Sequence, residues 1–441
     1  MPGIPRDSAF DSSIAFMREG YAFIPRRRAR YGSDLFQARI MLRKAIFVGG
    51  PDAARMFYQP DRFTRKGALP PSAVALLQDY GSVQLKDGAA HRSRKRLFTG
   101  LLDVQGTADL ATAAEDAWAR EVPAWTGRVV LHDAFQALLC RAACRWAGIP
   151  EAQADLPRRT REFAAMIDGA GAVGPRNWRG LLLRARCERW ARGLVRAVRD
   201  GSLDPGSGSP LAAVAAHCDP DGEPLPVKIA AIELLNLLRP TVAVARFLTF
   251  GALALHAHPE WRARLAQGDR GDLERFAQEV RRFYPFFPAV GGRATHDFEW
   301  QGHRFRKGDW VMLDLYGSNR DPRLWNDPER FDPERFRDWQ PDPYTLVPQG
   351  GGELGVTHRC PGERATVEIM MRLMRRLAGE IDYAVPAQDL GIDLGRMPTL
   401  PASGFVVEDV RPRGAGKAAS GHEKAGAGPA SSSNLGRGDR I

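Results

Sequence analysis

One cysteine lies in a segment whose other residues are unusual around a purely structural thiol. Residues 347–363 read Val-Pro-Gln-Gly-Gly-Gly-Glu-Leu-Gly-Val-Thr-His-Arg-Cys-Pro-Gly-Glu, which places Cys360 behind a glycine-rich loop. Glycine adopts backbone conformations that other residues avoid, so such a loop can lie flat under a large ring. A thiolate presented in this way can ligate a haem iron and favours O–O bond cleavage. The alternative is a buried structural cysteine, because free cysteine is among the most buried residue types.

A second motif is a charged pair at helical spacing. Glu279 and Arg282 are three residues apart, so they can meet on one helix face, although most such pairs are simply solvated. The aromatic run at 283–288 follows immediately, which predicts that this face is buried and that the pair needs further hydrogen-bond partners. The tetrapeptide Pro-Glu-Arg-Phe occurs at 328–331 and again at 333–336. We assign Arg335 of the second copy as the third partner, because it is nearer the cysteine loop.

The third motif lies in a long apolar stretch at 226–256, which contains Arg239 followed by Pro240. Proline lacks an amide hydrogen and clashes with the carbonyl four residues earlier, so we expect a kink. A buried guanidinium needs an anion. Glu233 is six residues away and poorly placed on the same helix. A substrate carboxylate, which a guanidinium binds in a bidentate manner, is the better candidate.

Taken in order, the Glu-x-x-Arg helix, the second Pro-Glu-Arg-Phe and the Cys-Pro-Gly loop resemble the cytochrome P-450 superfamily over about residues 10–410. Monooxygenases of that superfamily normally carry an acid–alcohol pair where this chain has Arg239-Pro240. That pair, with the stretches at 283–290, 313–319 and 348–352, resembles the fatty-acid peroxygenase branch, nearest to the bacterial fatty-acid alpha-hydroxylase.

The resemblance implies haem b (iron protoporphyrin IX) with Cys360 as thiolate ligand, and hydrogen peroxide in place of dioxygen and a reductase. It also implies that Arg239 holds the carboxylate of a long-chain fatty acid, which then acts as general acid–base. Positioned there, C2 and to some extent C3 lie nearest the iron, so hydroxylation at C2 is expected. The alternatives are decarboxylation to a terminal alkene, a reductase-dependent monooxygenase, and a haem sensor or carrier without turnover.

Further site residues follow from the same resemblance. Gln84, with Pro240, is expected to shape the distal pocket; the branch's decarboxylases often have histidine at the position of Gln84, so glutamine favours hydroxylation. The walls of an apolar channel, or else ordinary core, are Phe287, Pro288 and Val290. The basic residues expected to face the haem propionates are Arg65, His91, Lys95, Arg293 and His358.

Two positions depart from the branch. Thr357 stands where a glycine is expected, which would stiffen the loop. Gly291 and Gly292 stand where bulkier apolar residues are usual, which would widen the cavity wall.

The pattern along the chain predicts a mainly α body with a minor β part, and the resemblance implies a cytochrome P-450 fold, triangular, with a long central helix over the haem. Hydrophobic periodicity predicts helices at 50–58, 107–122, 131–147, 156–171, 176–199, 226–256, 272–283 and 363–381. Short strands are expected within 36–47 and at 298–300 and 310–315.

The whole chain has 441 residues, of which 44% are hydrophobic and 26% charged, an ordinary globular composition. We expect one catalytic domain at 1–412 and a disordered basic tail at 413–441, which is rich in Gly, Ala and Ser and lacks aromatic residues. The net charge of +11 raises the possibility of nucleic-acid binding, but the basic residues are scattered along helices, so none is predicted. With neither a secretory signal nor a transmembrane segment, a cytoplasmic protein is expected.

Overall fold

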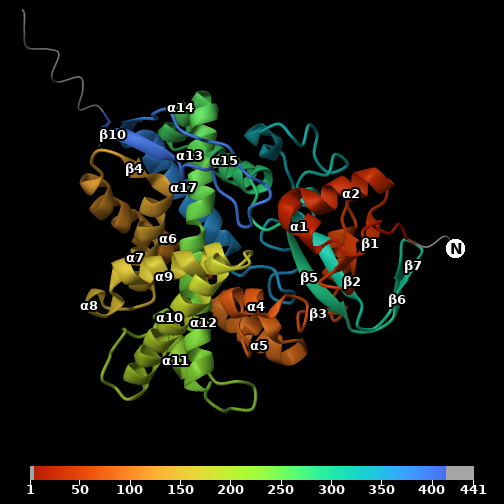
Figure 1. Cartoon of the computed structure of the whole chain (residues 1–441). Coiled ribbons are helices and arrows are strands. Elements are labelled where there is room, and N and C mark those ends of the chain that lie inside the picture. Colours follow the sequence, from red (N-terminus) through yellow and green to blue (C-terminus); the bar gives the residue numbers. More distant parts are fainter. Residues whose placement is uncertain (1–3, 414–441) are drawn as a thin grey trace, which may run out of the picture.

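Two consecutive apolar helices run through the centre of the computed structural model, which describes residues 4–413 (Figure 1). They are α12 (Val227–Ala243) and α13 (Ala245–Ala257). The expected helix over 226–256 is therefore right in extent but wrong in continuity, since it is interrupted at Val244. The amide of Val244 bonds to the carbonyl of Thr241 at 3.2 Å, a tightened turn. Pro240 lies inside α12, four residues before the interruption, and offers no amide hydrogen to the helix.

Most other helices pack on one side of this central pair, and the sheet with α1 (Ser13–Glu19) and α2 (Phe23–Tyr31) lies on the other side (Figure 1). The helices with predicted counterparts are α3 (Ala53–Phe57), α6 (Val104–Glu121), α7 (Leu131–Trp146), α9 (Leu156–Gly169), α10 (Pro175–Arg199), α15 (Arg270–Phe283) and α17 (Glu363–Gly379). Eight further helices were not predicted as such: α1, α2, α4 (Pro71–Leu77), α5 (Gly88–Leu101), α8 (Glu151–Ala154), α11 (Pro210–Ala216), α14 (Pro259–Gln267) and α16 (Leu315–Ser318).

The main sheet has five strands in the order β1-β2-β8-β5-β3, and only β2 and β8 run parallel. These strands are β1 (Leu35–Ile40), β2 (Arg43–Val48), β8 (Trp310–Asp314), β5 (Ala289–Ala294) and β3 (Phe63–Thr64). Two smaller sheets pair β4 (Val129–Val130) and β9 (Ile381–Ala384) with β10 (Val406–Pro412), and β6 (Phe298–Trp300) with β7 (His303–Phe305). The prediction of a mainly α fold with a minor β part is confirmed.

The two glycines of β5 permit close packing. A Cβ on Gly291 would lie 2.5 Å from the carbonyl oxygen of Ala68, and a Cβ on Gly292 would lie 2.9 Å from Cβ of Phe63. The expectation that these glycines widen a cavity wall is wrong, because neighbouring atoms already occupy the space. They instead let the segment at 63–68, which includes Arg65, approach the sheet.

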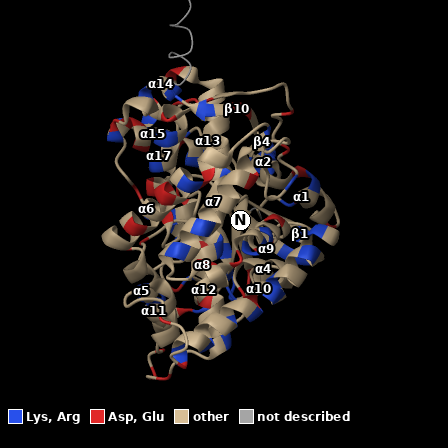
Figure 2. Ribbon diagram, turned by 90° about the vertical axis from the view of Figure 1, so that its left-hand side faces the viewer, with Lys and Arg blue, Asp and Glu red and all other residues tan. Residues whose placement is uncertain are grey.

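The end of the described chain is tied to the body. The amide of Arg413 donates to the carbonyl of Glu380 at 2.8 Å, directly after β10. The rest of the predicted tail, 414–441, lies outside the described residues. Within the described part, no helix is both long and apolar enough to cross a bilayer. Lys and Arg alternate with acidic residues over the helices visible in Figure 2, as the sequence indicated.

Candidate active site

A buried ion network joins α15 to the second Pro-Glu-Arg-Phe segment. On α15, Arg282 Nε donates to Glu279 Oε2 at 2.6 Å and Nη2 donates to Oε1 at 2.8 Å, and neither side chain is exposed. Arg335 Nε donates to the same carboxylate at 3.3 Å, so the second Pro-Glu-Arg-Phe supplies the third partner. The remaining donors of Arg282 reach the carbonyls of Asn319, Pro328 and Arg330. Complete hydrogen bonding is what a buried pair requires.

A second network, which sequence reasoning missed, holds the cysteine loop. Glu363, the first residue of α17, accepts from Arg281 of α15 and from Arg359 Nε, the latter at 2.6 Å. The amide of Cys360 donates to the carbonyl of Gln349 at 3.1 Å. The signal was present in the sequence, because Arg281 is adjacent to Arg282 and Glu363 closes the Cys-Pro-Gly-Glu motif.

The glycine-rich part of the loop needs glycine at two positions. Gly350 and Gly352 have φ of +91° and +84°, values that favour glycine. A Cβ on Gly352 would lie 2.6 Å from Cγ2 of Thr357. Thr357 Oγ1 lies 2.9 Å from the carbonyl oxygens of both Gly351 and Glu353. Thr357 therefore bridges two parts of the loop by hydrogen bonds, which agrees with the expectation that it stiffens the loop.

The thiol of Cys360 is half-buried at the start of α17. Burial raises the pKa of Cys360, while a backbone N–H of Gly362 and the ammonium of Lys95 act in the opposite direction and stabilise the thiolate. Coordination to a metal deprotonates such a thiol outright.

Four of the five predicted propionate partners form one basic cluster beside this loop. The rings of His91 and His358 stack with centroids 4.2 Å apart, and Lys95 Nζ donates to the carbonyl of Thr357 at 3.0 Å. Arg65 Nη1 donates to the carbonyl of Gly291 at 2.5 Å.

The positive charge of this cluster resides on Arg65 and Lys95, because burial lowers the pKa of both histidines and keeps their imidazoles neutral. Burial, reinforced by the neighbouring cations, lowers the pKa of His91 to about 4, and burial lowers the pKa of Lys95 to about 8. Among the described residues, none of the four basic side chains has a carboxylate within 4.0 Å. Arg65 and Lys95 supply buried positive charge and the neutral imidazoles of His91 and His358 can donate hydrogen bonds, so the four residues fit the two propionates of a haem.

Arg293 is not brought into this cluster. It lies on β5, where Nε donates to the carbonyl of Gly67 at 3.0 Å and Nη1 to that of Gly308 at 3.3 Å, with Arg43 and Asp309 nearby. The structure gives no support to its predicted contact with a propionate.

Arg239 is buried in α12, and no carboxylate of residues 4–413 pairs with it. Nη1 donates to the carbonyl of Leu76 at 2.9 Å, and Nη2 donates to the carbonyl of Leu77 and to Asn236 Oδ1. Burial, with the nearby Arg184, lowers the pKa of Arg239 to about 9. Neither the two carbonyls of α4 nor the amide of Asn236 was foreseen as partners of Arg239.

The internal acid considered above is engaged elsewhere. Glu233 Oε1 accepts from Val83 N at 2.7 Å and from Arg94 Nη1 at 3.1 Å, and Oε2 accepts from Asn236 Nδ2 at 3.0 Å. Glu233 is therefore engaged with Arg94 and Asn236 and is not the partner of Arg239.

Gln84 lies against the central helix. Its Oε1 accepts from Asn236 Nδ2 at 3.2 Å, one helical turn before Pro240. Gln84 is therefore part of the same polar group as Asn236 and Arg239.

The three predicted channel residues divide between two environments. Phe287 is 39% exposed and contacts Phe286, which stacks on Phe247 of α13 at 4.2 Å. Pro288 accepts from the amides of residues 315 and 316, and Val290 packs against the core of the sheet. Only Phe287 is thus exposed next to the central helix.

Comparison with known proteins gives consistent matches. The family model described as Cytochrome P450 matches residues 273–378, which contain Glu279, Arg282, Arg335 and Cys360. Two curated relatives match over short segments: rhazimal synthase of Alstonia scholaris is 30% identical over 177 residues, 35% of this chain and 34% of that protein. Ferruginol synthase of Salvia miltiorrhiza is 34% identical over 116 residues, 25% of this chain and 23% of that protein. The chain thus matches a third or less of the length of these relatives.

The solved structures match almost throughout. A variant of cytochrome P450SP alpha (CYP152B1) is 43% identical, with a TM-score of 0.89 over 92% of this chain and 100% of that chain. Cytochrome P450EX alpha (CYP152N1) with myristic acid is 37% identical, with a TM-score of 0.89 over 93% and 100%. A variant of cytochrome P450 OleT with arachidonic acid is 33% identical, with a TM-score of 0.90 over 93% and 99%.

Proposed function

Because the chain belongs to the cytochrome P450 family of haem-thiolate oxidoreductases, we propose that it hydroxylates long-chain fatty acids at C2, with some C3 product, and takes its oxidant from hydrogen peroxide. The observation that carries this proposal is the buried guanidinium of Arg239, which has no carboxylate partner among the described residues. Two similar structures were solved with myristic acid and with arachidonic acid, so related chains do hold carboxylic acids with long alkyl chains.

A haem held by Cys360 would supply the oxidising chemistry. Arg65, His91, Lys95 and His358 are the residues proposed to face its propionates. The charges of Arg65 and Lys95 and the N–H groups of the two histidines would stabilise the carboxylates.

Arg239 binds and orients the substrate. Its planar guanidinium suits a carboxylate in a bidentate arrangement, and Asn236 fixes the orientation of the guanidinium. The held carboxylate oxygen takes a proton from one oxygen of hydrogen peroxide and returns it to the other, which leaves as water. The net reaction converts the acid and hydrogen peroxide to the hydroxy acid and water.

The regiochemistry follows from where the carboxylate is fixed. An acid anchored at its first carbon presents C2 and then C3 to the reacting centre. Gln84 is hydrogen-bonded to Asn236 and remains neutral, so it can order the carboxylate but cannot deliver a proton as an imidazolium would. We therefore favour hydroxylation over decarboxylation.

A single incubation tests the proposal. Purified haem-loaded protein is mixed with tetradecanoic acid and hydrogen peroxide, without reductase or nicotinamide, and the products are identified by mass spectrometry. The expected product is the 2-hydroxy acid. An alkene one carbon shorter would retain the role of Arg239 and overturn the interpretation of Gln84. No product with intact haem would refute the fatty-acid function.

The same incubation tests whether the protein needs a reductase. Turnover without a reductase is expected, whereas activity only with an electron-transfer partner would favour a conventional monooxygenase. Cytoplasmic location stays a prediction.

A further inference from the structure

A groove of about 790 Å³ opens between α1, the loop from α9 to α10, and the segment at 393–397. Its surface combines apolar side chains with cationic ones, namely Met17, Val173, Met397, Arg18, Arg176 and Arg396. The three segments interlock closely: a Cβ on Gly171 would lie 2.8 Å from the carbonyl oxygen of Met397, and a Cβ on Gly395 would lie 2.4 Å from that of Arg18. A groove of this composition suits a molecule with an anionic head and an apolar chain.

Two arginines of the groove, Arg176 and Arg396, and the buried Arg246 behind its lining converge on one carboxylate. Asp168, at the end of α9, lies 3.0 Å from Arg396 Nη2, 3.5 Å from Arg176 Nε and 3.8 Å from Arg246 Nη2. Three guanidinium groups and one carboxylate leave an excess of two positive charges. The groove is also lined by Arg18 and Asp393, whose opposite charges leave this excess unchanged.

Arg246 is the buried member of the cluster. Its side chain is 3% exposed, Nη1 donates to the carbonyl of Thr399 at 3.2 Å, and Nε has no partner among residues 4–413. Burial, aided by the nearby Arg396 and Arg176 and opposed by Asp168, lowers the pKa of Arg246 to about 10. A buried and incompletely paired guanidinium is costly, so an anion from outside would stabilise it.

The cluster is joined to the central helices that carry Arg239. Arg246 follows Arg239 by seven residues, which places both on one side of these helices, about 10 Å apart along the axis. The next residue, Phe247, stacks on Phe286, and Tyr21 Oη donates to the carbonyl of Phe286 at 2.8 Å. Arg246 therefore connects the arginines of the groove, through Asp168, with the helical segment next to Arg239.

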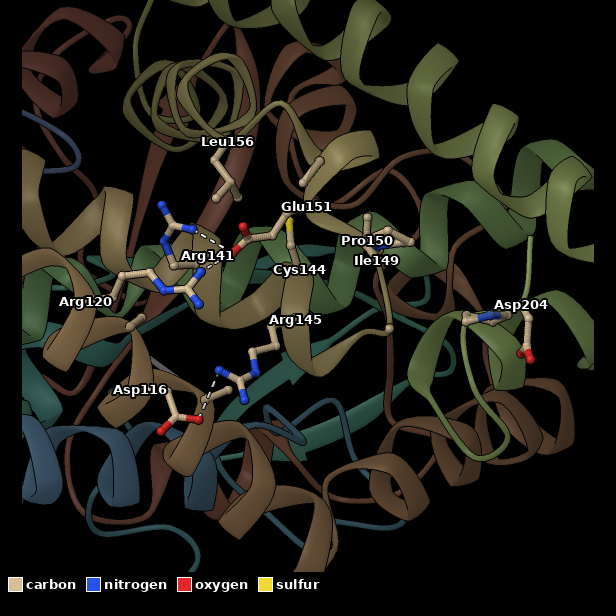
Figure 3. Close-up of a pocket in the computed structure, with 15 residues that line it drawn as sticks. Asp116, Arg120, Arg141, Cys144, Arg145, Ile149, Pro150, Glu151, Leu156 and Asp204 are labelled. Atoms are coloured by element: carbon tan, nitrogen blue, oxygen red, sulfur yellow. Dashed lines mark hydrogen bonds and ion pairs between the residues drawn. The ribbon is translucent and has the colours of Figure 1, made fainter. Parts of the chain in front are cut away.

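A second hollow shows how arginines are arranged without such an excess. It has a volume of about 400 Å³ between α6, α7 and α8 (Glu151–Ala154), and Figure 3 shows its side chains. There Arg145 pairs with Asp116 at 3.1 Å, while Arg120 and Arg141 both pair with Glu151, at 2.6 and 2.7 Å. Arg141 also pairs with a second carboxylate. Every arginine of this hollow therefore has a close carboxylate.

We propose that Arg176, Arg246 and Arg396 form a second carboxylate-binding position, which receives the fatty acid at the mouth of the cavity before its carboxylate reaches Arg239. This inference rests on the proposed function and deepens it. Cations at an entrance raise the association rate of an anionic ligand, and the effect weakens as salt is added. Asp168 competes with the ligand for the same guanidinium groups.

The test uses two variants that break the same ion pair. Arg396→Gln and Asp168→Asn both remove the 3.0 Å contact. Stopped-flow absorbance of the haem gives the association rate constant of tetradecanoate with the ferric full-length holoprotein, without peroxide. Arg396→Gln should lower this constant about threefold or more at low salt, and Asp168→Asn should raise it. Association of tetradecanol, which carries no charge, should not change.

The matched controls are Arg145→Gln and Asp116→Asn, which change the net charge equally at the pair in Figure 3. They should leave the association rate constant unaltered. Changes of the same sign in Arg396→Gln and Asp168→Asn would show a purely structural ion pair and overturn the inference. Equal effects from the control pair would overturn it too, by showing that net charge alone acts. A wild-type protein that does not bind tetradecanoate would refute the fatty-acid function itself, and with it the inference.

Discussion

Asn236 Oδ1 accepts a hydrogen bond from Arg239 Nη2 at 2.8 Å, one turn apart on α12. The amide nitrogen of the same Asn236 donates to Gln84 and to Glu233. Asn236 thereby fixes the guanidinium of Arg239 on one side and the amide of Gln84 on the other, so Asn236 joins these two predicted site residues.

This relationship makes Asn236→Asp informative. An aspartate there would place a carboxylate beside Arg239 and pair with it, in competition with substrate. We expect the dissociation constant of tetradecanoate, measured by haem absorbance, to rise about tenfold or more, the loss expected for one strong charge-assisted bond. Binding of imidazole to the haem is the control and should not change. Unaltered affinity for tetradecanoate would show that Arg239 does not hold the acid.

Arg239→Ala should abolish turnover of fatty acids while haem content stays intact. Without the guanidinium the carboxylate is not held and the proton on hydrogen peroxide has no carrier. Product formation is measured by mass spectrometry and haem content by absorbance. Arg239→Lys keeps the charge but loses the bidentate geometry, so intermediate activity is expected. Full activity of the alanine variant on fatty acids would contradict the substrate-assisted mechanism.

Cys360→Ala should lose the carbonyl band characteristic of a thiolate ligand in the reduced protein. The side chain lies three residues before α17, in a loop that the ion network of Glu363 holds, so the rest of the loop should remain in place. The measurement is the difference spectrum of the reduced protein with carbon monoxide. Survival of the band would show that another residue is the ligand.

Glu279→Gln should destabilise the fold strongly. The change leaves Arg282 buried and unneutralised, and breaking a buried pair in this way costs about 3–5 kcal/mol of the free energy of unfolding. Urea titration measures this free energy. Asp116→Asn, in a largely exposed pair, serves as control and should change it little. Similar free energies of unfolding for the two variants would show that the network of Glu279 and Arg282 does not stabilise the fold.

His132 should make the protein sensitive to acid. It is buried, its Nδ1 lies 3.1 Å from Thr249 Oγ1, and burial together with Arg246 lowers its pKa to about 3. Between the ordinary histidine pKa of about 6.5 and this value, the unfolded chain binds a proton that the folded chain does not. Stability therefore falls as pH falls through this window, by up to about 1.4 kcal/mol per pH unit from this group.

His132→Gln removes that contribution. Urea titrations at pH 7, 6 and 5 should show a shallower loss of stability in the variant than in the wild type. Parallel losses in the two proteins would exclude His132 as the cause.

The sequence was most informative where partners are close along the chain or lie in ordered motifs. The long helices with a regular apolar face were predicted within a few residues, and Glu279 and Arg282 meet as their spacing indicated. The β5 strand was missed, because Gly291 and Gly292 interrupt its apolar pattern. These positions need glycine because atoms of Ala68 and Phe63, which are distant in the sequence, lie close to them in the folded chain.

The candidate site shows the same division. Arg239 was identified from its type and its proline neighbour, yet its closest partners are backbone carbonyls of Leu76 and Leu77. A carbonyl carries no information about side-chain type, so no pattern in the sequence could point to it. Arg293 was assigned by position in the family, and the fold directs it to Gly67 and Gly308 instead.

The interruption at Val244 lies between the two buried arginines, one on each helical segment. They share a side of the helix only because seven residues separate them, close to two full turns. Inserting or deleting one residue between them would rotate Arg246 by about 100° away from the groove and leave Arg239 in place. Selection for the entry of charged acids would therefore act on the length of the segment between Arg239 and Arg246. The seven-residue interval can be used to identify other chains with the same arrangement of arginines.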